Sequence, residues 1–274
     1  MSIAWSSDFS YKYYRKLLET IREHYSLYLM SEAEQILNID SERPKLILRH
    51  DVDLDLSCAV ALAEIENELG ISACYMVLSD SPFYFLDDIS SKNHLNTLLE
   101  LGHEIGLHFD LNGFISQSIL SGVDFDSEEL SLNPLFDKIL HDIKLLEEVT
   151  SAPIESISFH RPSPESLNGP FRIHGIINAY SAELMDYYLS DSKGRWREGE
   201  PLKSLESPKK PLLQLLIHPI WWGTTHMKAK DRLQWFFESR TPHFSNKQRI
   251  SFDNEIFRHA GLSRSGRIEL ETIE

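Results

Sequence analysis

Residues 46–70 read LILRHDVDLDLSCAVALAEIENELG, and the fold prediction starts from this stretch. Its first three residues, Leu46-Ile47-Leu48, form a continuous apolar run, as expected of a parallel strand buried on both faces. Polar residues follow, and from Asp55 to Leu69 apolar residues recur at helical spacing until Gly70 ends the pattern. The stretch therefore predicts a strand, a polar loop and a helix, the first part of a βαβ unit.

The alternation of short apolar runs and helical patterns continues along most of the chain, which predicts an α/β fold with a parallel sheet. Further strands are predicted at Ala73–Leu78, His103–His108, Ser156–His160, Tyr187–Ser190 and Leu212–His218. Further helices are predicted within Ser10–Tyr28, Ser91–Leu101 and Asp231–Ser239, and from Asn133-Pro134 onward over the apolar stripe that ends at Leu146. Loops are expected over Leu111–Leu132 and Lys203–Pro211.

Composition narrows the classes of partner. Among 274 residues, 27 Lys and Arg face 42 Asp and Glu, a net charge of 27 − 42 = −15. This balance argues against nucleic acid and anionic membranes as partners. No apolar run approaches the roughly 20 residues of a membrane helix, so no membrane insertion is expected. The start of the sequence lacks the pattern of a secretory signal, and the expected location is cytoplasmic.

Polar and titratable residues gather where the predicted strands end. Leu46-Ile47-Leu48 runs into residues 49–53, and the other three strands run into His108-Phe109-Asp110, His160-Arg161-Pro162 and His218-Pro219. In parallel α/β folds the carboxyl ends of the strands meet at one edge, where the following loops build binding and catalytic sites. We therefore expect the functional site at this edge.

Strand alternation predicts which of these side chains meet. Asp51 and Asp53 are two residues apart and project to one side of an extended chain, whereas His50 points to the other side. His103 and His108 are separated by an odd number of residues and lie on opposite faces of a continuous strand. We expect His108 to be functional and His103 to be structural.

Five short segments in order resemble the motifs of the polysaccharide deacetylase family with the NodB-homology domain, which are carbohydrate esterases. They are Arg49-His50-Asp51-Val52-Asp53, Gly102–His108, Phe159–Pro162, Asp191–Trp196 and Leu216-Ile217-His218-Pro219. The first is similar to a variant branch associated with surface-polysaccharide biosynthesis. The resemblance implies a distorted (β/α) barrel of about seven strands over residues 44–222, with a helical lead-in at 1–43 and a C-terminal extension, its tail disordered, at 223–274.

The resemblance also implies roles for single residues. Asp51 would be the general base, Arg161 would orient that base, and His218 would be the general acid. Asp53 and His108 would hold a divalent metal, with zinc first and cobalt, manganese or nickel as alternatives. The implied activity removes an N- or O-acyl group, such as acetyl, from a saccharide or sugar precursor.

The sequence departs from the family pattern at two positions. Val52 stands where the family has the second of two adjacent Asp residues, and Asn112 stands where it has a second metal-binding His. Catalytic zinc sites normally use three protein ligands, so a third is needed. His160 is the first choice, with Asp110 and Asn112 as alternatives. Against His160, alternation puts it and Arg161 on opposite faces unless Pro162 has already ended the strand.

Four residues are predicted to contact the substrate, which we expect to be a small molecule or an oligosaccharide: Tyr84, Asp191, Trp196 and Trp222. The alternative function is a catalytically inactive relative that binds a saccharide or scaffolds a biosynthetic complex with unidentified partners. A third reading is hydrolysis of a different C–N bond on the same scaffold.

Overall fold

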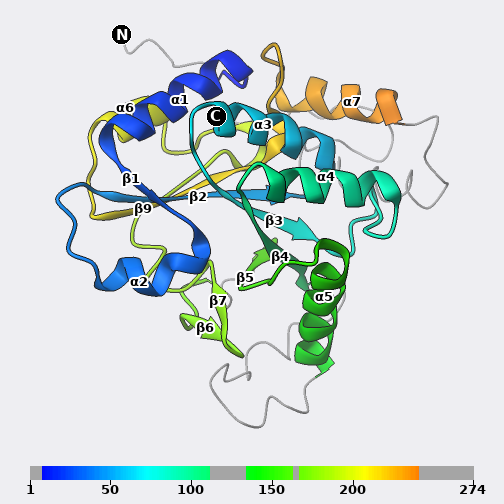
Figure 1. Cartoon of the computed structure of the whole chain (residues 1–274). Coiled ribbons are helices and arrows are strands. Elements are labelled where there is room, and N and C mark those ends of the chain that lie inside the picture. Colours follow the sequence, from blue (N-terminus) through cyan, green and yellow to red (C-terminus); the bar gives the residue numbers. More distant parts are fainter. Residues whose placement is uncertain (1–7, 112–133, 163–166, 241–274) are drawn as a thin grey trace.

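The computed structural model describes residues 8–111, 134–162 and 167–240, and within them the chain builds one curled sheet (Figure 1). The strands form a path in the order β6-β7-β5-β4-β3-β2-β9-β8, and β1 pairs with β2 beside this path. Their bounds are β1 Ser26–Tyr28, β2 Lys45–Val52, β3 Cys74–Leu78, β4 Glu104–Asp110, β5 Ser156–His160, β6 Arg172–Ile173, β7 Ile176–Asn178, β8 Tyr188–Ser190 and β9 Leu212–Ile217.

The strand pairs are parallel except for β6 with β7, as the βαβ pattern predicted. Helices α3, α4 and α5 follow β2, β3 and β4 in the chain, and α3 and α4 lie side by side over the sheet (Figure 1). The helices are α1 Tyr11–His24, α2 Ala33–Asn38, α3 Leu56–Glu68, α4 Ile89–Glu100, α5 Pro134–Thr150, α6 Pro201–Glu206 and α7 Ala229–Arg240. The expected α/β fold of the distorted-barrel type is confirmed.

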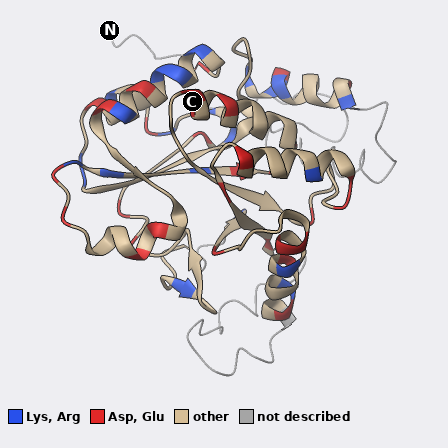
Figure 2. Ribbon diagram, in the orientation of Figure 1, with Lys and Arg blue, Asp and Glu red and all other residues tan. Residues whose placement is uncertain are grey.

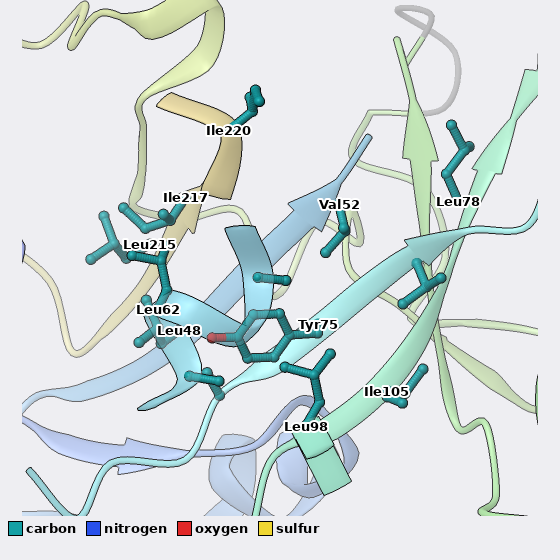
Figure 3. Close-up of a cluster of buried hydrophobic side chains, with 14 of the residues drawn as sticks. Leu48, Val52, Leu62, Tyr75, Leu78, Leu98, Ile105, Leu215, Ile217 and Ile220 are labelled. Carbon is teal, nitrogen blue, oxygen red and sulfur yellow. The ribbon is translucent and has the colours of Figure 1, made fainter. Parts of the chain in front are cut away.

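Side chains of β2 and β3 alternate between two apolar clusters. The larger cluster, on the helix-covered side, includes Leu48 and Val52 of β2 and Tyr75 of β3, packed with Leu62 of α3 (Figure 3). The smaller cluster, on the inner side, includes Ile47 of β2 and Cys74 and Met76 of β3. The inner side beyond this small cluster is left for polar groups, because most apolar residues of β2 face outward.

Gly106 allows the strands to approach closely on the inner side. A Cβ atom at this position of β4 would lie 2.4 Å from Sδ of Met76, 2.6 Å from Oγ of Ser156 and 3.1 Å from the Ser156 carbonyl oxygen. Any larger residue would therefore push β3 or β5 away from β4. Since β4 and β5 each supply a residue to the candidate functional site, Gly106 helps to set its width.

Several elements differ from the prediction. The N-terminal helix ends at His24, because Tyr25 is extended and leads into β1, which the sequence pattern did not reveal. The short strands β6 and β7 were also missed, so the sheet has nine strands in the described residues where about seven were expected. The loop predicted from Lys203 begins as helix α6, which starts with Pro201 at its first position. The loop predicted over Leu111–Leu132 and the tail from 241 fall almost wholly outside the described residues.

The surface carries charges of both signs. Figure 2 shows basic and acidic residues mixed on α1 and α5 rather than gathered into a stripe of one sign. None of the described helices is both long enough and apolar enough to cross a membrane. The division of the chain at residues 43 and 222 stays a prediction, and β1, from the first part, is a strand of the sheet.

Candidate functional site

Three side chains bring donor atoms together at the carboxyl end of the sheet. Asp53 directly follows β2, His108 lies near the end of β4, and His160 ends β5. Oδ1 of Asp53 lies 3.2 Å from Nε2 of His108 and 3.2 Å from Nδ1 of His160, and these nitrogens are 3.3 Å apart. The structure thus places together the three residues that the sequence analysis proposed as metal ligands.

The donor triangle has the dimensions of one face of a zinc tetrahedron. Ligand atoms about 2.0–2.1 Å from zinc lie about 3.3–3.4 Å apart in a tetrahedron. Oδ1 of Asp53 is buried and forms no hydrogen bond of good geometry with the described residues, although two imidazole nitrogens lie close to it. One carboxylate and two imidazoles leave a fourth position open, as catalytic zinc sites do. The residues therefore fit such an ion.

The residues of the donor triangle shift one another's pKa values, so metal binding at the triangle depends on their protonation. Burial acts to raise the pKa of Asp53, but the neighbouring His160 and His108 outweigh it and hold that pKa well below its usual range. Burial acts to lower the pKa of His160, and the Asp53 carboxylate raises it overall. Because a metal ligand must be a neutral imidazole, binding of an ion here displaces a proton that the metal-free triangle favours.

A backbone turn at Arg161 brings His160 and Arg161 to the same cavity. Arg161 has φ +54°, in the left-handed region that is uncommon for residues other than glycine, and it directly follows the last residue of β5. Strand alternation therefore stops at His160, and both His160 and Arg161 line the same cavity. The argument from alternation against His160 as a ligand does not apply, because β5 has already ended.

Ser158 orients the imidazole of His108. Ser158 lies two residues before His160 on the same face of β5, and its Oγ is 2.6 Å from Nδ1 of His108. The Ser158 hydroxyl also lies 3.5 Å from Oδ1 of Asp51, to which it donates. The hydroxyl is thereby left to accept from an Nδ1–H of His108, which leaves the lone pair of Nε2 facing Asp53. Such an outer hydrogen bond fixes the tautomer of metal-binding histidines.

Asp51 is held by a buried arginine from its own strand. Arg49 donates from Nε and Nη2 to the two carboxylate oxygens of Asp51, each at 2.9 Å, and neither side chain is more than 3% exposed. The other donors of Arg49 reach Gln214 at 2.7 Å and the Tyr180 hydroxyl at 2.8 Å. Burial acts to raise the pKa of Asp51, but the charge of Arg49 and then of His108 lower it overall.

The proton on His218 is stabilised by a buried carboxylate. Asp191, fully withdrawn from solvent just after β8, accepts from Nδ1 of His218 at 2.7 Å, from the His218 amide at 2.9 Å and from Nε1 of Trp222 at 2.9 Å. Burial acts to lower the pKa of His218, but the hydrogen bond and charge of Asp191 raise it to about 9. His218 is therefore a cation at neutral pH in the metal-free chain.

These groups share one cavity of about 830 Å³, within the usual range for small-molecule sites. The described residues that line it include Asp51, Arg161, His218 and the three residues of the donor triangle. Trp221 and Phe83 form part of its apolar wall. The cavity thus joins a candidate metal position to a carboxylate on one strand and a cationic histidine on another.

All four of the predicted substrate contacts have other partners and are not among the described residues that line the cavity. The Tyr84 hydroxyl donates to the Val52 carbonyl oxygen at 2.7 Å and accepts from the Leu78 amide at 2.9 Å, which ties the ends of β2 and β3 together. Trp196 stacks on Phe9, with ring centroids 6.5 Å apart, and Trp222 is buried against Asp191. Asp191 itself is covered by His218 and Trp222. Trp221 and Phe83 are among the aromatic residues that do line the cavity.

Comparison with known proteins gives no match to a family model and no match to a curated protein. Among solved structures, the chain is similar to a family 4 carbohydrate esterase from Bacillus anthracis, at 13% identity and a TM-score of 0.40, over 89% of this chain and 90% of that one. It is similar to the catalytic domain of a peptidoglycan N-acetylglucosamine deacetylase from Eubacterium rectale, at 13% identity and 0.40, over 76% and 89%. It is also similar to a family 4 pseudoenzyme from Bacillus anthracis, at 11% identity and 0.38, over 74% and 62%.

The opposite face of β2 carries a second polar cluster with a structural role. Glu66 of α3, fully buried, lies 2.8 Å from Nε2 of His50 and accepts from the Tyr75 hydroxyl at 2.8 Å and from Tyr14. His103 faces Glu66 and accepts from the Ala73 amide at Nδ1. The prediction that His50 and His103 point away from the site is confirmed.

Sequence reasoning missed Arg49 and Ser158. Both precede a predicted site residue by two positions in the same strand, since Arg49 precedes Asp51 and Ser158 precedes His160. The alternation that paired Asp51 with Asp53 places them on the inner face as well. Applying the two-residue period of a strand from each predicted site residue toward the N-terminus would have identified both residues.

Proposed function

We propose that this chain is a metal-dependent hydrolase that removes an acyl group from an amino or hydroxyl group of a saccharide. One observation carries the proposal: the donor triangle of Asp53, His108 and His160 lies in the same cavity as a carboxylate and a cationic histidine. Oδ2 of Asp51 lies 3.9 Å from Nε2 of His108, so Asp51 borders the position that the triangle leaves open.

The residues divide the reaction between them. A zinc or similar ion in the triangle would polarise the acyl carbonyl and make water acidic enough to react near neutral pH. Asp51 accepts the proton of the attacking water, and Arg49 keeps its carboxylate ionised and correctly turned. His218 donates its Nε2 proton to the departing nitrogen or oxygen, because Asp191 occupies Nδ1. Arg161 lines the same cavity, and its positive charge is proposed to help orient the carboxylate of the base, Asp51.

A saccharide substrate is supported by the chemistry of the walls and by the motif resemblance. Trp221 and Phe83 offer apolar faces against which sugar rings pack, and polar side chains surround them. The Arg49–Asp53 segment is similar to the branch associated with surface polysaccharides, so we propose an acylated amino sugar from such a biosynthetic route.

The Arg49–Asp51 pair favours a second candidate function, saccharide binding without catalysis. Both oxygens of Asp51 already accept from Arg49, and the pKa of Asp51 is lowered, which weakens it as a base. The departures from the family pattern at Val52 and Asn112 favour the same alternative. Under this alternative, the same cavity holds a sugar and the scaffold serves a biosynthetic complex.

The two functions are separated by metal analysis and acyl release. We expect the purified chain to bind about one zinc or cobalt ion and to release acetate from N-acetylated sugars. The variants Asp51→Asn and His218→Ala are expected to bind the ion and to release no acetate. Full release by either variant with the ion retained would overturn the roles of Asp51 as base and His218 as acid. Sugar binding without acetate release, with the ion bound, would establish the second candidate.

A further inference from the structure

The segment that follows Asp191 concentrates positive charge beside the cavity. Residues 192–197 read SKGRWR, with three cations in six positions, and acids flank this run at Asp191, Glu198 and Glu200. Two of the three, Lys193 and Arg197, line the cavity and are exposed at their positions. Such a concentration differs from the mixed charges that Figure 2 shows on α1 and α5.

Lys193 and Arg197 are also the cavity cations that the described residues leave without an ion pair. The acids of the cavity have partners elsewhere: Asp51 pairs with Arg49, and Asp80 lies 2.8 Å from Nζ of Lys138. Asp53 faces its two histidines. Asp110 and Arg161 add one charge of each sign. Lys193 and Arg197 are therefore available to pair with a ligand anion.

The turn that carries Lys193 is fixed in an unfavourable backbone conformation. Lys193 has φ +63° and ψ +27°, and Gly194 follows with φ +65°. A left-handed backbone is unfavourable for residues other than glycine, and such positions gather at functional sites. A Cβ at Gly194 would lie 2.6 Å from Cβ of Ala229 and 3.3 Å from the Trp221 ring, so the turn is packed firmly against the cavity wall.

The position of the turn indicates which part of a substrate it faces. Asp191 holds His218, and Lys193 is two residues further on, so its Cα lies within about 7.6 Å of that of Asp191. His218 stands where the departing sugar receives a proton, whereas the donor triangle stands where the acyl carbonyl lies. In this arrangement we place Lys193 on the side of the sugar rather than on that of the acyl group. This orientation rests on the proposed function; the charge of the turn does not.

We propose that Lys193 and Arg197 bind a phosphate group on the sugar, so that the site accepts a phosphorylated acylamino sugar. A phosphate ester carries about −1.5 to −2 charges at neutral pH, which matches the two unpaired cations. Arginine binds phosphate oxygens in a forked geometry and lysine binds them as a point charge. A sugar phosphate and a nucleotide diphosphate sugar share this chemistry.

Calorimetry on the full zinc-loaded chain tests the proposal. N-acetylglucosamine 1-phosphate is expected to bind at least about tenfold more tightly than N-acetylglucosamine, a difference of about 1.4 kcal/mol. The double variant Lys193→Asn/Arg197→Gln, in which asparagine tolerates the left-handed turn, is expected to lose this ratio. Lys193→Arg should keep it. The matched control Lys12→Gln/Lys16→Gln removes two exposed charges from α1 and should also keep it.

A second ligand identifies the source of the phosphate. Tighter binding of UDP-N-acetylglucosamine than of the sugar phosphate identifies a nucleotide sugar, and the reverse identifies a free sugar phosphate. Equal binding of phosphorylated and neutral sugars, or an unchanged ratio in the double variant, overturns the proposal. An unchanged ratio would place the phosphate on the metal, as would inorganic phosphate that binds the double variant as tightly as the wild type.

The failure of the proposed function is visible separately. If no acetate leaves any sugar but the binding ratio holds and depends on Lys193 and Arg197, the hydrolase proposal falls and the phosphate site stands. If the neutral sugar is deacetylated and phosphorylation brings no gain in binding or in kcat/KM, the hydrolase stands and the phosphate site falls.

Discussion

The buried guanidinium of Arg49 donates a hydrogen bond to each carboxylate oxygen of Asp51, both at 2.9 Å. Removing one partner of a buried ion pair typically costs about 3–5 kcal/mol, because the other charge stays buried alone. Arg49→Met is therefore expected to lower the free energy of unfolding by about 3–5 kcal/mol, measured by urea denaturation.

The matched control is Arg15→Met. Arg15 pairs with Glu68 on the surface, where both side chains are well exposed, and such pairs contribute about 0–1 kcal/mol. Equal losses of stability in the two variants would mean that the Arg49–Asp51 pair contributes no more than a surface pair.

Loss of His160 is expected to remove the metal site. With only Asp53 and His108 left, zinc affinity should fall by more than the ~10–100-fold that loss of an outer hydrogen bond causes. His160→Ala should therefore come through gel filtration without zinc, as measured by elemental analysis. His94→Ala, on α4 away from the site, should keep its zinc. Full zinc occupancy in His160→Ala would show that another residue completes the site.

Ser158→Ala tests the orientation of His108 without touching a ligand. The variant loses the partner of Nδ1, so zinc affinity is expected to fall by about 10–100-fold while the fold is kept. Ser156→Ala is the matched control, since Ser156 lies two residues earlier on β5 and its hydroxyl is 3.6 Å from Sγ of Cys74. Competition against a fluorescent zinc chelator measures both. Equal affinities in the two variants would contradict the role of Ser158.

The raised pKa of His218 predicts a pH-dependent stability in the metal-free chain. A pKa near 9, above the usual value of about 6.5, means that the stabilising proton is present in full below pH 6.5 and lost as pH rises toward 9. Compared with His218→Asn, the wild-type advantage should shrink by about 1.4 kcal/mol per pH unit in this window, about 3 kcal/mol in all. Denaturation of both proteins with chelator at pH 6, 7.5 and 9 measures it. A constant difference would mean that Asp191 does not stabilise the cation.

The sequence predicts the central part of the site because strand order and strand ends follow from simple periodicities. Asp53, His108, His160 and His218 all lie at or near the carboxyl ends of predicted strands, and the parallel order of β2, β3, β4, β5 and β9 brings those ends together. Polar residues that gather at the ends of several buried strands indicate a functional site. The carboxyl edge was therefore found without any knowledge of contacts.

The remaining features depend on tertiary contacts. Strands β6 and β7 have only two and three residues and carry no detectable period. The left-handed turn at Arg161 places this residue beside the same cavity as His160, and its residue type does not predict such a turn. Tyr84, Trp196 and Trp222 are aromatic residues near motifs, but their polar atoms or rings found partners in the core. An aromatic side chain in a loop is equally suited to the protein core and to the wall of a cavity.

Strand β2 carries polar groups toward both sides of the sheet: Asp51 meets Arg49 on one side, and His50 meets Glu66 on the other. A slip of one residue against β3 and β9 would exchange the two faces. Arg49 would then lose Gln214 and the Tyr180 hydroxyl, which lie on the inner side, and Glu66 would lose His50. The polar contacts that organise the site also make a misaligned sheet unfavourable. Contacts on both faces of β2 therefore favour the native alignment of the central strands during folding.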